Sequence, residues 1–369
     1  MFLSRLVFAC VFLVACGDDS SPPSDFDGGA DAASDVGAAD VGSLDAGGDV
    51  GPTPDSSVPD SGADVSVPDA ATTTPEDNDT TCQDDIDNDG DGDVDCDDED
   101  CQGLVLCPES MVRIVAANLT SGSGAPSYDA GHGIRIMDGL DGDVFLVQEM
   151  LFGNNTDAAF NTFARQVCGE ECEAYRGTGD LIPNGVVSRF PIVDAGVWDD
   201  PETDTREFAW ARIDVPGRPD LWAISIHLLT SSGAAREAES QALAAHINMN
   251  VPDGDHVVVG GDFNTGGGGA FTRLRGVVQL PPTPPRDQDG NTNTNAPRSR
   301  VLDGILVSRA LDQRELPVAI GGDSFPAGLV VDTRVFTPLE ALAPARLDDS
   351  DAIMMQHMAV VRDFRFYGL

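Results

Sequence analysis

Residues 17–107 contain 27 acidic side chains and no basic side chain. Residues 17–81 of this stretch consist mainly of Asp, Ser, Ala, Gly, Val, Thr and Pro. A segment with so few large apolar groups cannot bury enough surface to offset the entropy lost on ordering. We therefore predict that residues 17–81 form a disordered acidic linker. The chain beyond residue 107 is then left to supply one large folded domain or two small ones.

The charge of residues 108–369 excludes a protein that coats nucleic acid in general. This part has 36 acidic side chains against 20 Arg, and the whole chain contains no Lys. Non-specific binding to nucleic acid needs a basic surface that releases counterions, and this composition does not supply one. A multi-span membrane protein is also excluded, because the strongly apolar run at the N-terminus is too short to cross a bilayer.

The N-terminus has the features of an export signal. A positive segment, Met1–Arg5, precedes an apolar segment, Leu6–Ala15. Residues 13–17 read LVACG, which resembles a bacterial lipobox, whereas an ordinary signal peptide cut nearby is the alternative. The resemblance implies a lipoprotein signal peptide over residues 1–16 and lipidation of Cys16. The protein would then be anchored in the bacterial cell envelope, at the outer membrane or the cell surface.

Residues 82–108 form an Asp-rich segment bounded by Cys. Calcium binds six to eight hard oxygens, and a Gly turn lets alternate carboxylates converge on one ion. The DxDxDG run resembles thrombospondin type 3 repeats, which implies Ca²⁺ binding, and an extension of the acidic linker is the alternative. The candidate ligands are the alternate carboxylates of Asp87, Asp89, Asp91, Asp93 and Asp95.

The cysteines favour an exported, disulfide-bonded protein. Four of them lie in the Asp-rich segment, Cys82, Cys96, Cys101 and Cys107, and allow three pairings between which the sequence does not choose. Cys168 and Cys172 are four residues apart, and we predict a disulfide there because no second Cys/His pair lies nearby to complete a zinc site.

Residues 109–369 have the pattern of a mixed α/β domain. The clearest helix is expected over Ala234–Met249, where apolar and small residues recur at helical spacing. Strands are expected over residues 112–117, 143–147, 221–226, 256–259, 301–307 and 358–364. Few helices separate these strands, so two packed sheets with outer helices fit better than a simple βα alternation.

Polar side chains stand at the ends of these predicted strands, where a structural strand would not need them. Two Gly precede Asp262 and Asn264, which are two residues apart and share one face of an extended chain. The other polar residues at strand ends are Asn118, Glu149, His227, Asp303 and His357.

Seven segments in order resemble the endonuclease/exonuclease/phosphatase superfamily, which includes pancreatic-type deoxyribonuclease and bacterial sphingomyelinases. They read AANLTSG, DVFLVQEM, NGVVSRFPI, WAISIHLLTS, VVVGGDFNT, SRVLDGILVS and QHMAVVRDF. The resemblance implies a four-layer αββα sandwich of two mixed sheets. It also implies a divalent metal, Mg²⁺ or Mn²⁺, and hydrolysis of a phosphoester.

The resemblance also implies roles for single residues. Glu149 would be the main metal ligand and Asn118 would help to bind the metal and the phosphate, since hard oxygens suit magnesium. Asp262 would position or deprotonate the attacking water, and Asn264 would donate to the phosphoryl oxygens.

The two histidines complete the set. His227 and His357 would stabilise the charge of the pentavalent phosphorus and transfer protons, and Asp303 would hold the tautomer of His357. Asn295 and Arg298 lie in a segment that often faces substrate in this family. Because the chain has no Lys, Arg must supply any phosphate clamp, and the candidates are Arg206, Arg212, Arg298 and Arg300.

One position departs from the family pattern, which ends in Ser-Asp-His. Gln356 precedes His357 here, and Ser350-Asp351 lies upstream as if five residues were inserted. Either Asp349 or Asp351 folds back to the site, or the site works with a neutral group at this position.

The sequence therefore predicts a metal-dependent phosphoesterase, most readily a phosphodiesterase of nuclease type, displayed on a membrane surface through a lipid anchor. The substrate would be nucleic acid, a phospholipid head group or an inositol phosphate, and a monomer is expected. The alternative is a catalytically inactive, calcium-stabilised binding protein at the surface, which the Gln356 departure favours.

Overall fold

The computed structural model describes residues 75–84, 86–90, 94–119, 128–178, 182–217 and 219–367. The predicted signal peptide, Cys16 and residues 17–74 of the predicted linker lie outside this range, as do Asp91 and Asp93. None of the helices in the described part of the chain is both long and apolar enough to span a bilayer.

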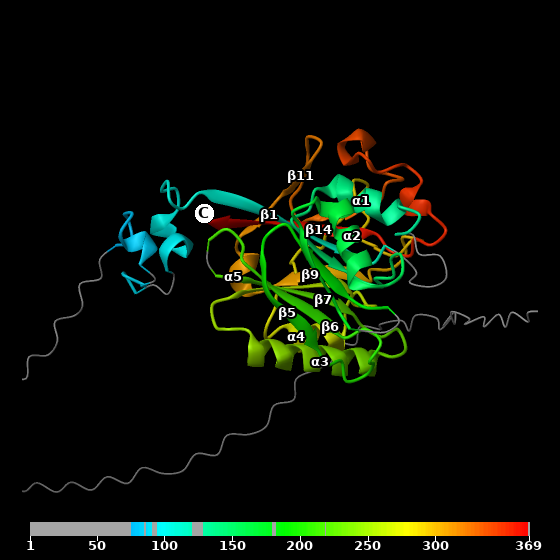
Figure 1. Cartoon of the computed structure of the whole chain (residues 1–369), viewed down its shortest axis with the longest axis horizontal. Helices are drawn as coiled ribbons and strands as arrows, with labels where there is room; N and C mark the ends of the chain where they lie inside the picture. The colour runs from blue at the N-terminus through cyan, green and yellow to red at the C-terminus, as the bar shows by residue number, and fades with distance from the viewer. Residues whose placement is uncertain are drawn as a thin grey trace, which may run out of the picture. The chain divides into compact units, whose positions relative to one another are not determined.

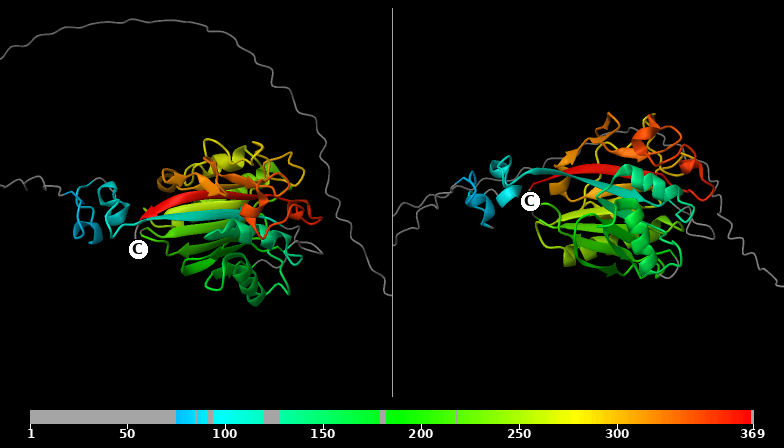
Figure 2. Two further views of the ribbon diagram at one scale, coloured as in Figure 1. Left: turned by 90° about the horizontal axis from the view of Figure 1, so that it is seen from above. Right: turned by 45° about the horizontal axis from the view of Figure 1, so that its top comes forward.

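The first sheet is built around β1, which pairs with β14 antiparallel and with β2 parallel. The strands follow the order β10-β14-β1-β2-β4-β3, and β13 also pairs with β14. Figure 2 shows β1 and β14, near the start and the end of the domain, side by side in both views. The bounds are β1 (Glu109–Ala117), β2 (Val144–Val147), β3 (Glu173–Arg176), β4 (Gly185–Ser188), β10 (Glu315–Leu316), β13 (Leu329–Val331) and β14 (Ala359–Tyr367).

The second sheet follows the chain in simple order, β5-β6-β7-β8-β9. β7 and β8 are parallel, and the other neighbours are antiparallel. A separate hairpin joins β11 (Val318–Ile320) to β12 (Asp323–Phe325). The bounds in the sheet are β5 (Ile192–Trp198), β6 (Phe208–Ile213), β7 (Leu221–His227), β8 (His256–Asp262) and β9 (Asp303–Val307).

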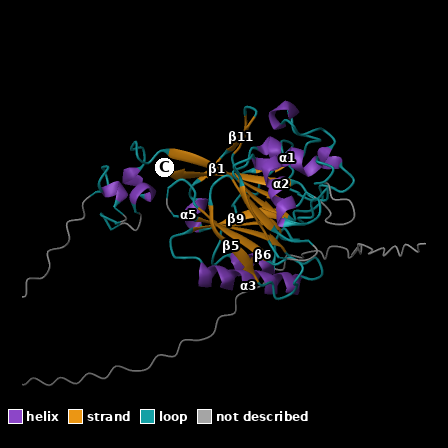
Figure 3. Ribbon diagram, viewed as in Figure 1, coloured by secondary structure: helices purple, strands orange, loops and turns teal. Residues whose placement is uncertain are grey.

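Helices cover the outer face of each sheet (Figures 1 and 3). α1 (His132–Leu140) and α2 (Asp157–Cys168) pack on the first sheet, and α3 (Gly233–Asn250) and α4 (Gly269–Leu274) pack on the second. α5 (Arg309–Asp312) is a single turn after β9. Short 3-10 turns lie at Thr81–Gln83, Asp95–Asp97, Glu99–Cys101, Leu339–Leu342 and Asp349–Asp351.

Strand alternation divides the apolar side chains among three cores. Val112, Ile114 and Ala116 of β1 lie in the core between the two sheets. Val115 and Ala117 belong instead to the core that includes α1 and α2. A third core joins the second sheet to α3 and α4. The predicted four-layer αββα sandwich of two mixed sheets is therefore confirmed.

All three tryptophans of the chain lie in the outer layer of the second sheet. The Trp198 ring stacks on those of Trp210 and Trp222, with centroids 5.6 and 6.2 Å away. Trp210 and Trp222 are tilted to each other at 5.0 Å, and His246 of α3 stacks on Trp198 at 5.5 Å. Gly196 on the neighbouring strand leaves room for this cluster, because a Cβ there would lie 2.8 Å from the Trp210 ring.

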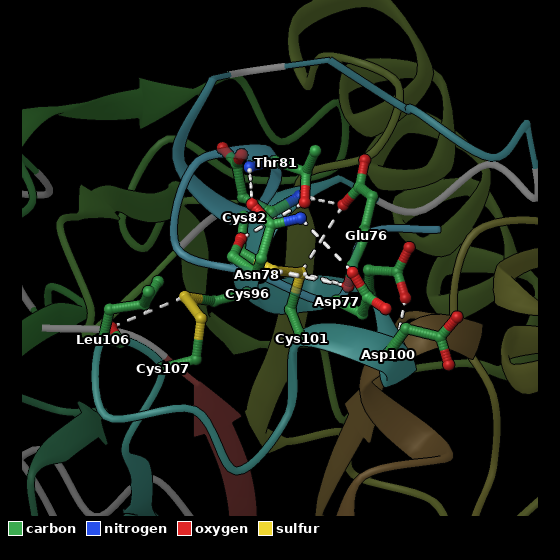
Figure 4. Close-up of a disulfide and its surroundings, with 12 residues drawn as sticks. Glu76, Asp77, Asn78, Thr81, Cys82, Cys96, Asp100, Cys101, Leu106 and Cys107 are labelled. Carbon is green, nitrogen blue, oxygen red and sulfur yellow. Dashed lines mark hydrogen bonds between the residues drawn. A yellow bond between two sulfur atoms is a disulfide. The ribbon is translucent and has the colours of Figure 1, made fainter. Parts of the chain in front are cut away.

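The Cys-bounded segment has two disulfides, Cys82–Cys101 and Cys96–Cys107, which resolves the pairing that the sequence left open (Figure 4). The predicted Cys168–Cys172 disulfide is confirmed at the end of α2. Disulfides stabilise small segments that bury little apolar surface, and the buried cluster here consists of Cys82, Cys101 and Cys107.

A buried carboxylate organises the loop of the same segment. The Glu76 side chain is fully buried and accepts hydrogen bonds from the backbone N–H groups of Asn88, at 2.7 Å, and Asp95, at 3.0 Å. The ordered part of this segment thus includes residues before Cys82, which the composition of residues 17–81 did not indicate.

Candidate active site

Four of the predicted site residues lie at the carboxyl ends of two pairs of parallel strands, β1–β2 and β7–β8. Asn118 follows β1 and Glu149 lies two residues beyond β2, while His227 and Asp262 are the last residues of β7 and β8. The carboxyl ends of parallel strands lie at one edge of a sheet, so each pair of side chains lies together. The two sheets then bring these edges against one another.

Asn118 joins the two sheets at this edge. Its Nδ2 donates to Asp262 Oδ2 at 3.1 Å and lies 3.4 Å from Glu149 Oε1. All three side chains are buried, and Glu149 is 7% exposed. Burial, as the largest effect, raises the pKa of Glu149 to about 7, although the cationic His357 and the Asn118 amide act against it. The site therefore holds two acidic groups close together away from bulk water.

His357 is held as a cation between two carboxylates. Its Nδ1 lies 2.8 Å from Asp303 Oδ2, and its Nε2 lies 3.5 Å from Asp262 Oδ2. Burial alone would lower the pKa of His357, but the charges of Asp303 and Asp262 outweigh burial and raise it to about 10. Asp303 opens β9 and pairs with Asp262 across the strands, so both partners of the imidazole come from the rigid sheet.

His227 is held in the neutral state. Its Nε2 lies 3.4 Å from Asp262 Oδ2 and 2.7 Å from an Nη of Arg206. Complete burial, as the largest effect, lowers the pKa of His227 to about 3, and the Arg206 charge acts in the same direction. Arg206 just precedes β6. It is one of the four Arg that the sequence offered for a phosphate clamp, but the sequence did not predict that it would lie beside His227.

Two glycines let the sheets approach closely behind the site. A Cβ at Gly260 would lie 2.5 Å from Leu146 of the other sheet. Gly261 has φ +138°, and a Cβ there would lie 2.2 Å from the Ile226 carbonyl and 2.6 Å from Gln148 Nε2. Only glycine fits at both points. The glycines before Asp262 thus serve packing between the sheets.

Asn264 holds the loop after β8 rather than pointing freely into the site. Its backbone N–H donates to Asp262 Oδ1 at 2.8 Å, and its Nδ2 donates to the Leu228 carbonyl at 2.7 Å. It adopts φ +51°, a region that Asn tolerates better than most residues. Asn264 therefore fixes one oxygen of Asp262 and links the ends of β7 and β8.

A buried acidic pair fixes the chain just beyond His227. Both carboxylate oxygens of Glu239, on α3, accept from the Leu229 backbone N–H at 2.9 and 3.0 Å. Burial, and next the nearby Asp200 carboxyl, raise the pKa of Glu239 well above its usual range. Neither Glu239 nor Asp200 was predicted from the sequence, because an acidic residue on a helix, such as Glu239, or in a loop, such as Asp200, usually faces solvent.

The two residues predicted to bind substrate are engaged with the protein. Asn295 Oδ1 accepts from the N–H groups of Ser299 and Arg300, both at 2.8 Å. Arg298 forms an ion pair with Asp287, and its Nε lies 3.2 Å from Asp332 Oδ2. Their predicted contact with substrate remains a prediction, and in this structure both hold a loop beside His357.

Neither upstream acid reaches the position of Gln356. Asp349 is buried against α1, where it pairs with Arg135 and lies 2.9 Å from His132 Nδ1. Asp351 is exposed and lies 3.4 Å from an Nη of Arg334. Of the two possibilities at this position, the structure has the one in which a neutral Gln356, itself exposed, precedes His357.

The residues predicted to bind a metal fit a hard cation. Glu149 Oε2 and Asn118 Oδ1 are buried and have no hydrogen-bond partner among the described residues. A buried carboxylate oxygen without a partner is costly, and carboxylate and amide oxygens suit Mg²⁺. Asp262, Asp303 and His357 also lie close enough to hold an ion, but the imidazole is already bonded to Asp303, so Glu149 and Asn118 are the better ligands.

The sequence matches one known family over most of the domain. Residues 113–324 match the Endonuclease/Exonuclease/phosphatase family. None of the curated proteins matches the sequence.

The fold is similar to several solved structures at low identity. A family protein from Leptotrichia buccalis has a TM-score of 0.47 and 13% identity, over 68% of this chain and 98% of that chain. A 3′ phosphatase from Neisseria, bound to a product DNA hairpin, has a TM-score of 0.45 and 15% identity, over 69% and 99%. An endonuclease/exonuclease/phosphatase from Beutenbergia cavernae has a TM-score of 0.44 and 16% identity, over 69% and 72%.

Binding of Mg²⁺ or Mn²⁺ should depend on pH through Glu149. A cation must displace the proton from this carboxyl group, whose pKa is raised to about 7, so affinity should rise between pH 6 and pH 8. Glu149→Gln should weaken binding at both pH values and remove the Glu149 contribution to the pH dependence, which isothermal titration calorimetry can measure. The matched control is Asp253→Asn, which changes an exposed carboxyl group in the turn between α3 and β8. Equal affinity in wild type and Glu149→Gln would contradict the assignment.

Proposed function

Because the chain belongs to the endonuclease/exonuclease/phosphatase family, whose members are phosphoesterases and nucleases, we propose that it is a divalent-metal-dependent phosphodiesterase. The observation that carries this proposal is the single buried cluster of Asn118, Glu149, Asp262 and the two histidines. Such a cluster offers ligands for a cation, a general base and donors for developing negative charge.

Glu149 and Asn118 would hold the cation through the buried oxygens that lack other partners. When bound, the cation would polarise a phosphoryl oxygen and offset the charge that develops on it. Asn118 Nδ2 would at the same time keep the Asp262 carboxylate in place, since it donates to Asp262 Oδ2 at 3.1 Å. Metal binding and water activation would thus share one rigid amide.

Asp262 is the group we assign to the attacking water. Its Oδ1 accepts from the Asn264 N–H at 2.8 Å, and its Oδ2, which accepts from Asn118 Nδ2, is the oxygen that faces the other groups of the site. Oδ2 lies between the Nε2 atoms of His227 and His357, at 3.4 and 3.5 Å. A water that donates to this oxygen would be oriented for attack, and Asp262 would accept its proton as the P–O bond forms.

The two histidines would act in different charge states. His357, held as a cation by Asp303, would donate from Nε2 to a phosphoryl oxygen or to the leaving oxygen. His227, kept neutral beside Arg206, would hold this half-buried guanidinium toward the charge that develops on the phosphoryl group. Arg suits this role because its planar donors match phosphate oxygens.

The substrate we propose is a phosphodiester of nucleic acid, with a phospholipid head group or an inositol phosphate as the competing classes. The excess of 36 acids over 20 Arg in residues 108–369 disfavours tight tracking along DNA. A substrate held mainly at the scissile phosphate fits this charge better, because Arg206 and the cation can offset it locally.

The catalytic test is a pair of substitutions. Asp262→Asn and His357→Ala should each lower phosphodiester hydrolysis roughly 10²-fold or more, the scale of a positioned acid or base. Extra magnesium should not restore either variant, whereas it should partly restore Glu149→Gln. Activity of purified protein on DNA, RNA, sphingomyelin and inositol phosphates, with magnesium and with EDTA, is the measurement, and Asp253→Asn is again the control.

A uniform background rate would overturn the enzyme assignment. If wild type, Asp262→Asn and His357→Ala behave alike on every phosphoester, the protein is instead a catalytically inactive binding domain. The exposed Gln356 gives a further arm of this test. If a missing carboxylate limits the reaction, Gln356→Asp should raise activity or lower the magnesium requirement.

We propose in addition that the Cys-bounded segment binds Ca²⁺. The alternating carboxylates of the Asp-rich run support this, together with the two disulfides and the loop held by Glu76. Limited proteolysis should show protection of residues 82–107 with calcium. Asp89→Asn should reduce this protection, and Asp79→Asn, outside the run, should not. Equal cleavage of wild type with and without calcium would rule out the proposal.

We also propose that Cys16 carries a lipid anchor in the bacterial cell envelope. The LVACG sequence supports this proposal. Cys16→Ser should leave the membrane fraction or accumulate as an unprocessed precursor, because several acyl chains on one Cys anchor stably. Cys10→Ser, within the apolar segment, is the matched control. If the Cys16 variant is processed and remains as firmly membrane-bound as wild type, the anchor lies elsewhere.

A further inference from the structure

Arg298 is held in a buried chain of ion pairs beside the active site. It pairs with Asp287 on one side and, at 3.2 Å, with Asp332 on the other, and its side chain is 11% exposed. Asp332 also pairs with Arg334 at 2.7 Å. The positive charge of Arg298 is therefore balanced by two carboxylates that are themselves 3–4% exposed. Little of this charge is left to attract a phosphate.

These ion pairs close a turn of the chain. Arg298 donates to the carbonyls of Asn291 and Asn293, and its own N–H donates to the Asn295 carbonyl at 2.7 Å. Its φ is +57°, in the left-handed region that residues with a Cβ rarely adopt. The side-chain bonds of Arg298 therefore offset an unfavourable backbone conformation and fix the shape of this turn.

The turn connects to Asp303 through Thr294. The Thr294 Oγ1 accepts from the N–H groups of Leu302 and Asp303, both at 2.9 Å. Thr294 is almost fully buried, and its own N–H donates to the Arg300 carbonyl at 2.8 Å. The start of β9, where Asp303 stands, is thus fastened to the turn that Arg298 closes.

The same turn connects to His357 through a short antiparallel pairing. The Met358 N–H donates to the Thr294 carbonyl at 2.6 Å, and the Ala296 N–H donates to the Gln356 carbonyl at 2.7 Å. Asn295 is the bridge partner of His357 between these two bonds. Residues 294–298 therefore form hydrogen bonds with both segments of the chain that carry the Asp303–His357 pair.

We propose that Arg298 is a positioning residue that sets the hydrogen bond between His357 Nδ1 and Asp303 Oδ2, and that it does not contact the substrate. This inference rests on the proposed function for its effect on the reaction. Its effect on the hydrogen bond can be observed without any substrate. The inference differs from the prediction that Arg298 binds phosphate, and the two give opposite kinetic results.

The test combines nuclear magnetic resonance with kinetics. In protein without metal or substrate, the His357 Nδ1 proton should give a far-downfield signal that disappears in Asp303→Asn. Arg298→Gln should shift or broaden this signal, lower kcat about 10- to 100-fold as expected for a misplaced catalytic group, and leave KM unchanged. In the Asp303→Asn background, Arg298→Gln should add little further loss, since both changes act on one hydrogen bond.

Arg298→Gln leaves Asp287 buried without its partner, so that variant can fail to fold. The double variant Arg298→Gln with Asp287→Asn removes one charge of each sign and keeps Asp332 paired with Arg334. Arg273→Gln, which loses a half-exposed ion pair with Glu237 on α3, is the matched control. It should retain the wild-type signal, kcat and KM.

Two results would overturn the inference. The first is an intact His357 signal with unchanged kcat and a raised KM in the Arg298 variants, which would make Arg298 a substrate contact. The second is an intact signal with all kinetic constants unchanged. If wild type hydrolyses no phosphoester, the proposed function fails, and the signal in the Arg298 variants still decides whether this residue positions His357.

Discussion

The hydrogen bond from Asn118 to Asp262 is the contact on which the arrangement of the site depends. Asn118 follows the central strand of one sheet and Asp262 ends a strand of the other, and their side-chain atoms lie 3.1 Å apart. That distance requires the sheets to approach closely, which Gly260 and Gly261 allow. A sandwich with slightly greater spacing would retain every strand and lose the site, because positioned groups tolerate displacements of only about 0.5 Å.

The close approach of the two sheets at the Asn118–Asp262 contact also brings the charged groups of the cluster together. Glu149, Asp262 and Asp303 bring three carboxyl groups into a buried volume, and the cationic His357 offsets part of their charge. Burial, as the largest effect, keeps His227 neutral although Asp262 lies close, and the Arg206 charge adds to this effect. The negative charge that remains in the cluster favours binding of a further cation near Glu149. The two imidazoles differ in charge because His357 faces an acid at each nitrogen, whereas the buried His227 faces one acid, Asp262, and the Arg206 guanidinium.

The sequence predicted the parts of the fold whose signal is local. The six expected strands and the helix over Ala234–Met249 are present because continuous apolar runs and helical spacing mark buried elements. The other strands went unpredicted. β5, for example, is half-exposed and interrupted by Asp194 and Gly196. The motif residues at strand ends do converge. Arg206 was indicated only as one of four possible phosphate clamps. Glu239 and the partners of Arg298 were not predictable, because their roles depend on contacts such as Arg298–Asp332 that no local pattern encodes.

Because all three tryptophans cluster in one outer layer, tryptophan fluorescence reports on only one part of this protein. Trp198, Trp210 and Trp222 stack on one another beneath α3, within distances at which excited indoles exchange energy. Tryptophan fluorescence therefore comes from a single place, the layer between the second sheet and α3. A denaturation curve followed by fluorescence records the detachment of that layer. It is silent about the Cys-bounded segment, which has no tryptophan.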